Sequence, residues 1–216
     1  MLIIGAKGFA KEVLEILHQK NDLQNIVFYD DVNDDIGDLL YGKFPVLKTE
    51  IEVDRFFESK CNKFTIGIGN PLLRYKMNLK FKKLDGELIT CLSPSCNVGN
   101  YEVDLGAGSV IMSGVNISNS TSLGIGCIVY YNSNITHDCI VGDFVEISPS
   151  VSLLGNVKVG SFTQIGSNAT ILPKITIGKN VIIGAGSVVT KDIPDNSVAV
   201  GIPALVVKKL DPLDFI

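Results

Sequence analysis

Long apolar runs are missing from this sequence. Its aliphatic residues are spread in short pieces, and no run reaches the roughly 18 residues that a membrane span needs. The first residues, MLIIGAKGF, lack the basic region and the cleavage site of a secretory signal. We therefore expect a cytoplasmic protein that does not cross a membrane.

Other scarce features exclude further classes of protein. The five cysteines have no paired spacing, which argues against a disulfide framework and against a zinc site. The formal net charge is −4, and there is no run of basic residues interleaved with aromatic ones, which argues against nucleic-acid binding. Only two histidines are present, His18 and His137, so imidazole chemistry has few candidates.

The second half of the chain has a strict six-residue period. From Leu105 to Val189 every sixth residue is aliphatic, without exception over fifteen positions. Glycine follows the aliphatic residue at intervals of 18 residues, at Gly106, Gly124, Gly142, Gly160 and Gly178. A hexapeptide period is typical of a β-helix, here with three hexads in each coil. Five coils spaced by about 4.8 Å would make a prism about 24 Å tall.

Each hexad also indicates which residues face the core and which form the bends. The aliphatic residue should point inward and stack on its counterparts in neighbouring coils. The residue four positions later is mostly small, as a tight corner requires: Ser109, Thr121, Cys127, Ser133, Cys139, Thr163, Ala169 and Ser187. Asparagine at the bends (Asn156, Asn168, Asn180) suits a left-handed backbone conformation.

The first 86 residues alternate between strand-like and helix-like segments. Strands are predicted at residues 2–5, 26–29 and 64–68, and helices after the first strand, at 51–59 and at 71–83. This alternation predicts a small Rossmann-like α/β domain with a parallel sheet. We expect residues 1–86 to form that domain, and residues 87–216 to form the β-helix domain with a C-terminal cap.

Ligands of parallel α/β sheets bind at the carboxyl ends of the strands. In this chain that edge carries Gly5, Lys7, Gly8, Asp30, Asp31, Gly69 and Asn70. A Gly-rich turn before a helix lets the backbone approach a phosphate, and an acidic group there can accept a hydrogen bond from a ribose or a base. Lys7 stands where the full dinucleotide motif needs glycine, so a purely structural turn is the alternative interpretation.

The histidine inside the repeat is followed by a carboxylate. His137 lies two residues after the inward Ile135 and should project from the prism, next to Asp138. A histidine beside a carboxylate on a rigid wall is a candidate general base, although an ordinary exposed histidine would have the same spacing. His18, at the end of the first helix, is better interpreted as a solvated or capping residue.

Motifs along almost the whole chain resemble the bacterial sugar acetyltransferase family. They are GAKGFAKEVLEIL, YDD, GIGNPLLR, ITHDCIVGDF and VGIPA. That family includes sialic acid O-acetyltransferases and N-acetyltransferases that act on UDP-4-amino-4,6-dideoxy sugars. The resemblance implies a left-handed β-helix, a homotrimer with active sites shared by adjacent subunits, and acetyl-CoA as co-substrate without a metal.

The resemblance also implies roles for individual residues. His137 would remove a proton from the acceptor, and Asp138 would hold the imidazole in the required tautomer. The acceptor would attack the thioester directly, and a backbone N–H near Gly155 would stabilise the oxyanion. Coenzyme A would lie along the prism near Ser167 and Ala185. The strand edge of the first domain would bind a sugar nucleotide.

Two positions depart from the family pattern. Glu146 stands where many relatives carry a second histidine, and Tyr130 stands where many carry an asparagine. Both positions lie near the acceptor in the family's arrangement, so we include them among the substrate-binding candidates and leave the acceptor's identity open.

Four functions compete for this sequence. We favour N-acetylation of a nucleotide-linked amino sugar for surface glycan synthesis, because Asp31 and the Gly-rich turn suit a nucleotide. O-acetylation of a sialic acid or a similar sugar is the second choice. A metal hydratase of the γ-class carbonic anhydrase type needs three histidine ligands, and the repeat has one. A β-helix scaffold subunit would have no reason to keep a His-Asp pair.

Overall fold

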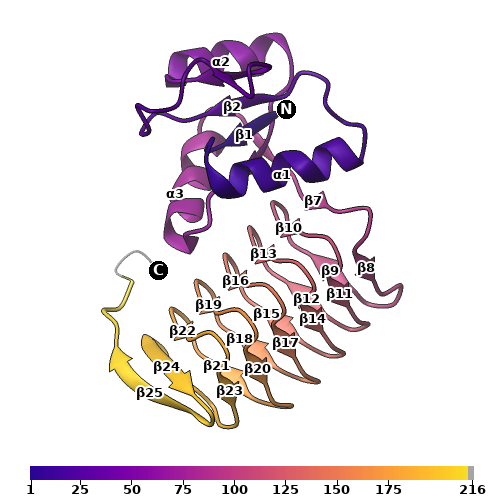
Figure 1. Ribbon diagram of the computed structural model, residues 1–216, viewed down its shortest axis with the longest axis vertical. Coiled ribbons are helices and arrows are strands. Elements are labelled where there is room, and N and C mark those ends of the chain that lie inside the picture. Colours follow the sequence, from indigo (N-terminus) through magenta and orange to yellow (C-terminus); the bar gives the residue numbers. More distant parts are fainter. Residues whose placement is uncertain (214–216) are drawn as a thin grey trace. The chain divides into compact units, whose positions relative to one another are not determined.

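The computed structural model describes residues 1–213 of the chain. The chain divides into two compact units, Met1–Pro94 and Ser95–Ile216 (Figure 1). Among the described residues no helix combines the length and the apolar character that crossing a membrane requires.

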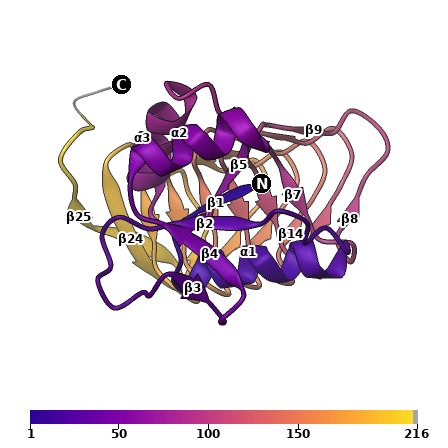
Figure 2. The same ribbon diagram turned by 90° about the horizontal axis from the view of Figure 1, so that it is seen from above.

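The N-terminal unit is built on a six-stranded sheet with the order β3-β4-β2-β1-β5-β6. All neighbouring strands are parallel except β3 and β4. Figure 2 shows β1, β2 and β4 side by side. Along the chain the elements are β1 (Leu2–Ile4), α1 (Gly8–Gln19), β2 (Val27–Tyr29), β3 (Leu39–Leu40), β4 (Phe44–Leu47), α2 (Glu50–Ser59), β5 (Lys63–Ile66), α3 (Pro71–Lys82), β6 (Glu87–Leu88) and β7 (Cys91–Leu92). The predicted parallel α/β domain is confirmed.

Local sequence explains where the helices begin. Thr49 and Glu52 form a reciprocal capping box at the start of α2, which satisfies two backbone N–H groups. Asn70 caps α3 through its side-chain oxygen, and Pro71 occupies the first helical position, where a missing N–H has no cost. The helix α1 buries one face, made of Ala10, Val13, Leu14, Ile16 and Leu17.

The C-terminal unit stacks short parallel strands in three faces. The first face contains β10 (Val110–Ile111), β13 (Ile128–Val129), β16 (Glu146–Ile147), β19 (Gln164–Ile165) and β22 (Ile182–Ile183). The second contains β8 (Asn97–Val98), β11 (Asn116–Ile117), β14 (Asn134–Ile135), β17 (Ser152–Leu153), β20 (Thr170–Ile171) and β23 (Val188–Val189). The third contains β9 (Asp104–Leu105), β12 (Ser122–Leu123), β15 (Ile140–Val141), β18 (Lys158–Val159) and β21 (Thr176–Ile177). This arrangement is the predicted β-helix and is consistent with a left-handed coil.

The aliphatic residues of the repeat form the core of the prism. All are buried except Leu105, which is half-buried in the first, incomplete coil. Neighbouring coils pair in a register of 18 residues, as in Val129 with Ile147. The small residues four positions later are buried as well, and several donate to a carbonyl oxygen of the next coil. Examples are the bonds from Ser133 Oγ to the Ser148 carbonyl (2.9 Å) and from Thr163 Oγ1 to the Gly178 carbonyl (2.8 Å).

A positive φ angle recurs at every sixth residue from Gly108 to Gly186. The predicted left-handed conformation of Asn156, Asn168 and Asn180 is confirmed, with φ of 64°, 59° and 52°. No residue in this series is β-branched, as the steric conflict of Cβ with the backbone requires. Asp138 belongs to the series, with φ of 59°.

A hairpin follows the last coil. The strand β24 (Ser197–Gly201) pairs in parallel with β22, and β25 (Ala204–Lys209) folds back against β24 in antiparallel orientation. The edge of the last strand on the first face is thereby paired, as expected of a cap on a stacked repeat.

The energetic cost of the left-handed corner can be measured at Lys174, because this residue is exposed and has φ of 66°. We expect Lys174→Gly to stabilise the protein by about 1 kcal/mol, since glycine adopts this conformation without a Cβ clash. The control Lys158→Gly, at an exposed strand position without positive φ, should destabilise by about 0.5–1 kcal/mol. Denaturant unfolding of both variants measures the difference, and an equal loss in both would contradict the explanation.

Candidate functional site

A cavity of about 370 Å³ opens at the carboxyl ends of the parallel strands in the N-terminal unit. The turn after β1, the end of β2, the turn after β5 and the first turns of α3 line it. The lining includes six of the seven predicted residues of this edge: Gly5, Lys7, Gly8, Asp30, Asp31 and Gly69. Asn70 is not part of the lining. The structure therefore brings the six together, while their contact with a ligand stays a prediction.

Glycines allow the close packing of the cavity wall. Gly5 has φ of 93°, and a Cβ on it would lie 3.0 Å from the carbonyl oxygen of Gly67. A Cβ on Gly67 would lie 2.5 Å from the Cα of Ala10, at the start of α1. The turn after β1 and the end of β5 thus approach each other and α1 at distances that only glycine permits.

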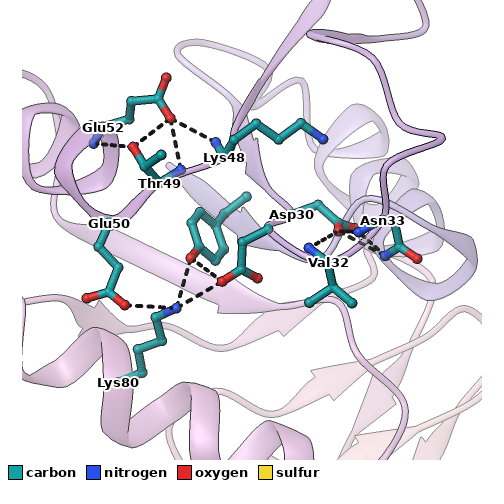
Figure 3. Close-up of polar contacts among 10 residues, drawn as sticks. Asp30, Val32, Asn33, Lys48, Thr49, Glu50, Glu52 and Lys80 are labelled. Carbon is teal, nitrogen blue, oxygen red and sulfur yellow. Dashed lines mark hydrogen bonds and ion pairs between the residues drawn. The ribbon is translucent and has the colours of Figure 1, made fainter.

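The carboxylate of Asp30 is used to hold the cavity wall together. It is 5% exposed and accepts hydrogen bonds from the backbone N–H groups of Ala6 (3.1 Å) and Asn33 (3.0 Å) and from the Asn33 side-chain amide. The backbone N–H of Val32 is a further donor, at 3.3 Å (Figure 3). Asp30 therefore ties the turn after β1 to the loop after β2.

Asp31 has a different environment. Its Oδ2 accepts a hydrogen bond from the Tyr29 hydroxyl (2.7 Å) and an ion pair from Lys80 (3.2 Å), and its side chain is 38% exposed. Partial burial raises the pKa of Asp31, but the hydrogen bonds from Tyr29 and Lys80 lower it more, so the net pKa is below the usual value. Asp31 is therefore an ionised acceptor on the wall of the cavity.

Lys7 and Asn70 also have partners within the protein. Lys7 Nζ forms an ion pair with Asp35 Oδ1 at 2.8 Å, and both side chains are exposed. Asn70 Oδ1 accepts the backbone N–H of Leu73 at 3.0 Å as the cap of α3. These contacts explain both residues structurally, and the predicted substrate contacts of both stay predictions.

Sequence reasoning did not include the apolar part of the lining. Leu73 and Met77 come from α3 and Tyr29 from β2. The spacing of four residues between Leu73 and Met77 places them on one helix face, which is a signal that could have found them. An apolar helix face predicts core packing equally well, however, so the pattern alone does not identify a ligand wall.

In the C-terminal unit, His137 projects from the turn between β14 and β15, as predicted. Its Nδ1 lies 2.6 Å from Asp138 Oδ2, and the two side chains are 63% and 50% exposed. A carboxylate at Nδ1 favours the tautomer with the proton on Nδ1, which leaves Nε2 as the acceptor. In the neutral imidazole, Nε2 would thus be the nitrogen that accepts a proton.

Gly155 lies one coil beyond His137, under the imidazole. A Cβ at Gly155 would be 2.5 Å from His137 Cε1 and 2.7 Å from Nε2, so only glycine leaves room for the ring in this position. The Gly155 carbonyl accepts from Lys174, but its N–H donates to no other residue of the described 1–213 segment. The Gly155 N–H is therefore a candidate donor to a developing negative charge on oxygen.

The other predicted residues of this unit lie elsewhere on the prism. Tyr130, Ser167 and Ala185 belong to turns from the first face to the second, and Glu146 lies on β16 of the first face. His137, Asp138 and Gly155 belong to turns from the second face to the third. Glu146 accepts a hydrogen bond from the Gln164 amide at 2.9 Å. A single chain therefore places Ser167 and Ala185 on a different corner from His137, whereas Gly155, also predicted to contact acetyl-CoA, shares the corner of His137.

The cysteines pack as predicted for corner residues. Cys127 and Cys139 are buried, and their thiols donate to the carbonyls of Gly142 (3.1 Å) and Leu154 (3.4 Å). Burial raises the pKa of the Cys139 thiol, which makes it a poor nucleophile. The part of the chain that the structure describes has no group of three or more His, Cys, Asp and Glu side chains that could hold a metal ion.

Two family models match the chain. Residues 1–81 match the PglD N-terminal domain, and residues 156–191 match the bacterial transferase hexapeptide, a model of six repeats. No curated protein matches the sequence at a significant level.

Several solved structures are similar over nearly their whole length. A mutant of perosamine N-acetyltransferase from Caulobacter crescentus, in complex with CoA and GDP-perosamine, is 31% identical, with 96% of each chain covered and a TM-score of 0.87. The acetyltransferase domain of PglB from Neisseria gonorrhoeae, in complex with acetyl coenzyme A, is 30% identical, with 95% of this chain and 98% of that chain covered and a TM-score of 0.85. WeeI from Acinetobacter baumannii is 29% identical, with the same coverage and a TM-score of 0.86.

Proposed function

The chain belongs to the bacterial hexapeptide-repeat sugar acetyltransferase family, and from that premise we propose that it moves an acetyl group from acetyl-CoA to the amine of a nucleotide-linked amino sugar. The observation that carries the proposal is the His137–Asp138 pair, with its free Nε2 above Gly155 on the β-helix. The cavity of the N-terminal unit supplies a separate site for the nucleotide.

In the proposed reaction the amine nitrogen attacks the thioester carbonyl carbon of acetyl-CoA. His137 Nε2 takes the proton that the amine loses, and Asp138 stabilises the imidazolium that forms. The N–H of Gly155 stabilises the oxyanion of the tetrahedral intermediate. When the C–S bond breaks, the proton passes to the departing sulfur. The products are an N-acetylated sugar nucleotide and free coenzyme A.

The cavity suits a nucleotide because it combines apolar walls with a charged acceptor. Leu73 and Met77 offer apolar surface to a base, and Asp31 offers an ionised carboxylate. The backbone of Gly5, Lys7 and Gly8 lies at the start of α1, where the positive end of the helix dipole favours a diphosphate. These features favour a nucleotide-bearing acceptor over a free sialic acid, which has neither a base nor a diphosphate.

We also propose that the active enzyme is a homotrimer. His137 and Gly155 lie on one corner of the prism, whereas Ser167 and Ala185 lie on another. If adjacent prisms bring unlike corners together around a three-fold axis, each interface completes one active site. Tyr130 and Glu146 would then face the acceptor from the neighbouring subunit. The enzyme would act in the cytoplasm, where acetyl-CoA and nucleotide sugars are available for surface glycan synthesis.

A thiol-release assay with acetyl-CoA tests the substrate class. UDP-, dTDP- and GDP-linked 4-amino-4,6-dideoxy sugars and free sialic acid are offered in parallel. We expect thiol release with at least one nucleotide amino sugar and none with sialic acid, because only the former matches both sites. Release with sialic acid alone would replace the proposed N-acetylation by O-acetylation.

His137→Ala tests the catalytic base. We expect kcat to fall about 10²- to 10⁴-fold, the usual contribution of a positioned general base, with acetyl-CoA affinity nearly unchanged. Asp138→Asn should cost less, because the base itself remains. The matched control is His18→Ala, at an exposed site near the end of α1, which should retain wild-type kcat. Activity of His137→Ala within threefold of wild type would refute this mechanism.

Shared active sites can be tested by light scattering and complementation. The mass of the assembly measured by light scattering should be three times the 23.3 kDa of the chain.

In the complementation test, His137→Ala and Ala185→Trp should each be inactive alone. Co-expressed, they should recover about one quarter of wild-type activity, because each mixed trimer has one interface with both intact corners. A monomer or dimer would exclude the trimer, and a lack of recovery would exclude sharing between these corners.

A further inference from the structure

Lys80 sits behind the cavity wall as the centre of a four-residue network. Its Nζ lies 2.8 Å from the Tyr29 hydroxyl, 3.2 Å from Asp31 Oδ2 and 3.2 Å from Glu50 Oε1. Figure 3 shows Lys80 reaching from α3 toward Glu50 at the start of α2. Lys80 therefore connects two helices to the end of β2, although it is not part of the cavity lining itself.

The network holds Lys80 charged and in one place. Its side chain is 22% exposed, and its Nζ lies 4.9 Å from the centre of the Tyr29 ring. Partial burial lowers the pKa of Lys80, but the hydrogen bonds to Tyr29, Glu50 and Asp31 raise it more, so the net pKa is above the usual value. Lys80 stays protonated at neutral pH and donates to both Tyr29 and Asp31.

These contacts use only one of the two oxygens of the Asp31 carboxylate. Oδ2 accepts from both Tyr29 and Lys80, whereas no other described residue donates to Oδ1. A carboxylate held through one oxygen keeps the other in a fixed orientation, which lowers the ordering cost of binding a donor. Asp31 lines the cavity, so a ligand there can reach its carboxylate.

We infer that Lys80 is a positioning residue for nucleotide recognition: together with Tyr29 it fixes Asp31 so that Oδ1 accepts a hydrogen bond from the nucleotide. This inference rests on the proposed function, because it requires a nucleotide in the cavity. The same geometry distinguishes Asp31 from its neighbour Asp30, whose two oxygens already accept from Ala6 and Asn33. Only Asp31 has acceptor capacity left.

The test compares Lys80→Met with wild type in steady-state kinetics and in calorimetry with UDP, dTDP and GDP. Methionine keeps the length of the side chain and removes the charge and the donors. We expect KM for the nucleotide sugar to rise about tenfold, the size expected when a charge-assisted hydrogen bond is lost. The kcat at saturation and KM for acetyl-CoA should stay within twofold, because Lys80 does not touch the reacting atoms.

Matched variants separate positioning from general stability. Lys82→Met changes an exposed lysine two residues further along the same helix and should leave both KM values unchanged. Lys80→Arg should restore much of the affinity, because arginine can still donate to Tyr29 and Asp31. Tyr29→Phe removes one donor to Asp31 and keeps the ring packed on Phe81, so it should raise the nucleotide KM by itself. Melting temperatures of all variants are recorded.

A double-mutant cycle with Asp31→Asn decides whether Lys80 acts through Asp31. If it does, Lys80→Met adds no further rise in KM to Asp31→Asn. Additive effects, or a Lys80→Met enzyme with wild-type nucleotide affinity, would overturn the inference while leaving the proposed function intact. If Lys80→Met does not fold, Tyr29→Phe replaces it in the same cycle, with the same two outcomes. A wild-type enzyme that binds none of the three nucleotides refutes the proposed function, and the inference with it.

Discussion

The backbone hydrogen bonds of the β-helix join residues one coil apart, and the rest of the C-terminal unit depends on that register. The N–H of Gly106 donates to the Leu123 carbonyl and the N–H of Gly160 to the Ile177 carbonyl, both at 2.8 Å. Each regular strand has only two residues, so a shift of one residue in the pairing of a strand would turn its aliphatic side chain away from the core. The extra residue in the seven-residue step from Val98 to Leu105 is accommodated in the turn between β8 and β9, because Val98 still pairs with Ile117 and Leu105 with Leu123.

The same register determines which residues lie next to His137. Residues 18 apart stack, so the residue beside the imidazole in the next coil is fixed as Gly155, and any side chain there would displace the ring. Asp138 occupies the left-handed corner of its hexad, so its carboxylate reaches Nδ1 from a backbone conformation that the repeat imposes. The geometry of the His137–Asp138 pair is thus a local variation of a structural repeat, and it needs few residues of its own.

In the N-terminal unit, some polar residues hold the wall of the cavity together, whereas others face the cavity. Asp30 and Asp31 are adjacent and chemically identical, yet successive residues at a strand end point in different directions. Asp30 is buried among backbone donors of two loops, and Asp31 meets the cavity and the Lys80 network. The distinction decides which of the two can recognise a ligand, and it depends on loops and helices far apart in the chain.

The sequence alone determined the β-helix, its coil length, its core and its bends, because stacking repeats a single local rule that the six-residue period records directly. It also offered His137 with Asp138 as a candidate base, and the resemblance to the acetyltransferase family favoured that role over an ordinary exposed histidine. Only the tertiary structure decided that Ser133 and Thr163 donate to carbonyl oxygens of the next coil and that Gly155 leaves room for the imidazole. It also decided that both oxygens of Asp30 accept hydrogen bonds within the protein, whereas Asp31 is held by Lys80. Tyr29 and Lys80 are separated by 51 residues. Contacts between side chains that distant follow from how α3 packs beside β2, and no periodicity in a single sequence encodes such a pairing.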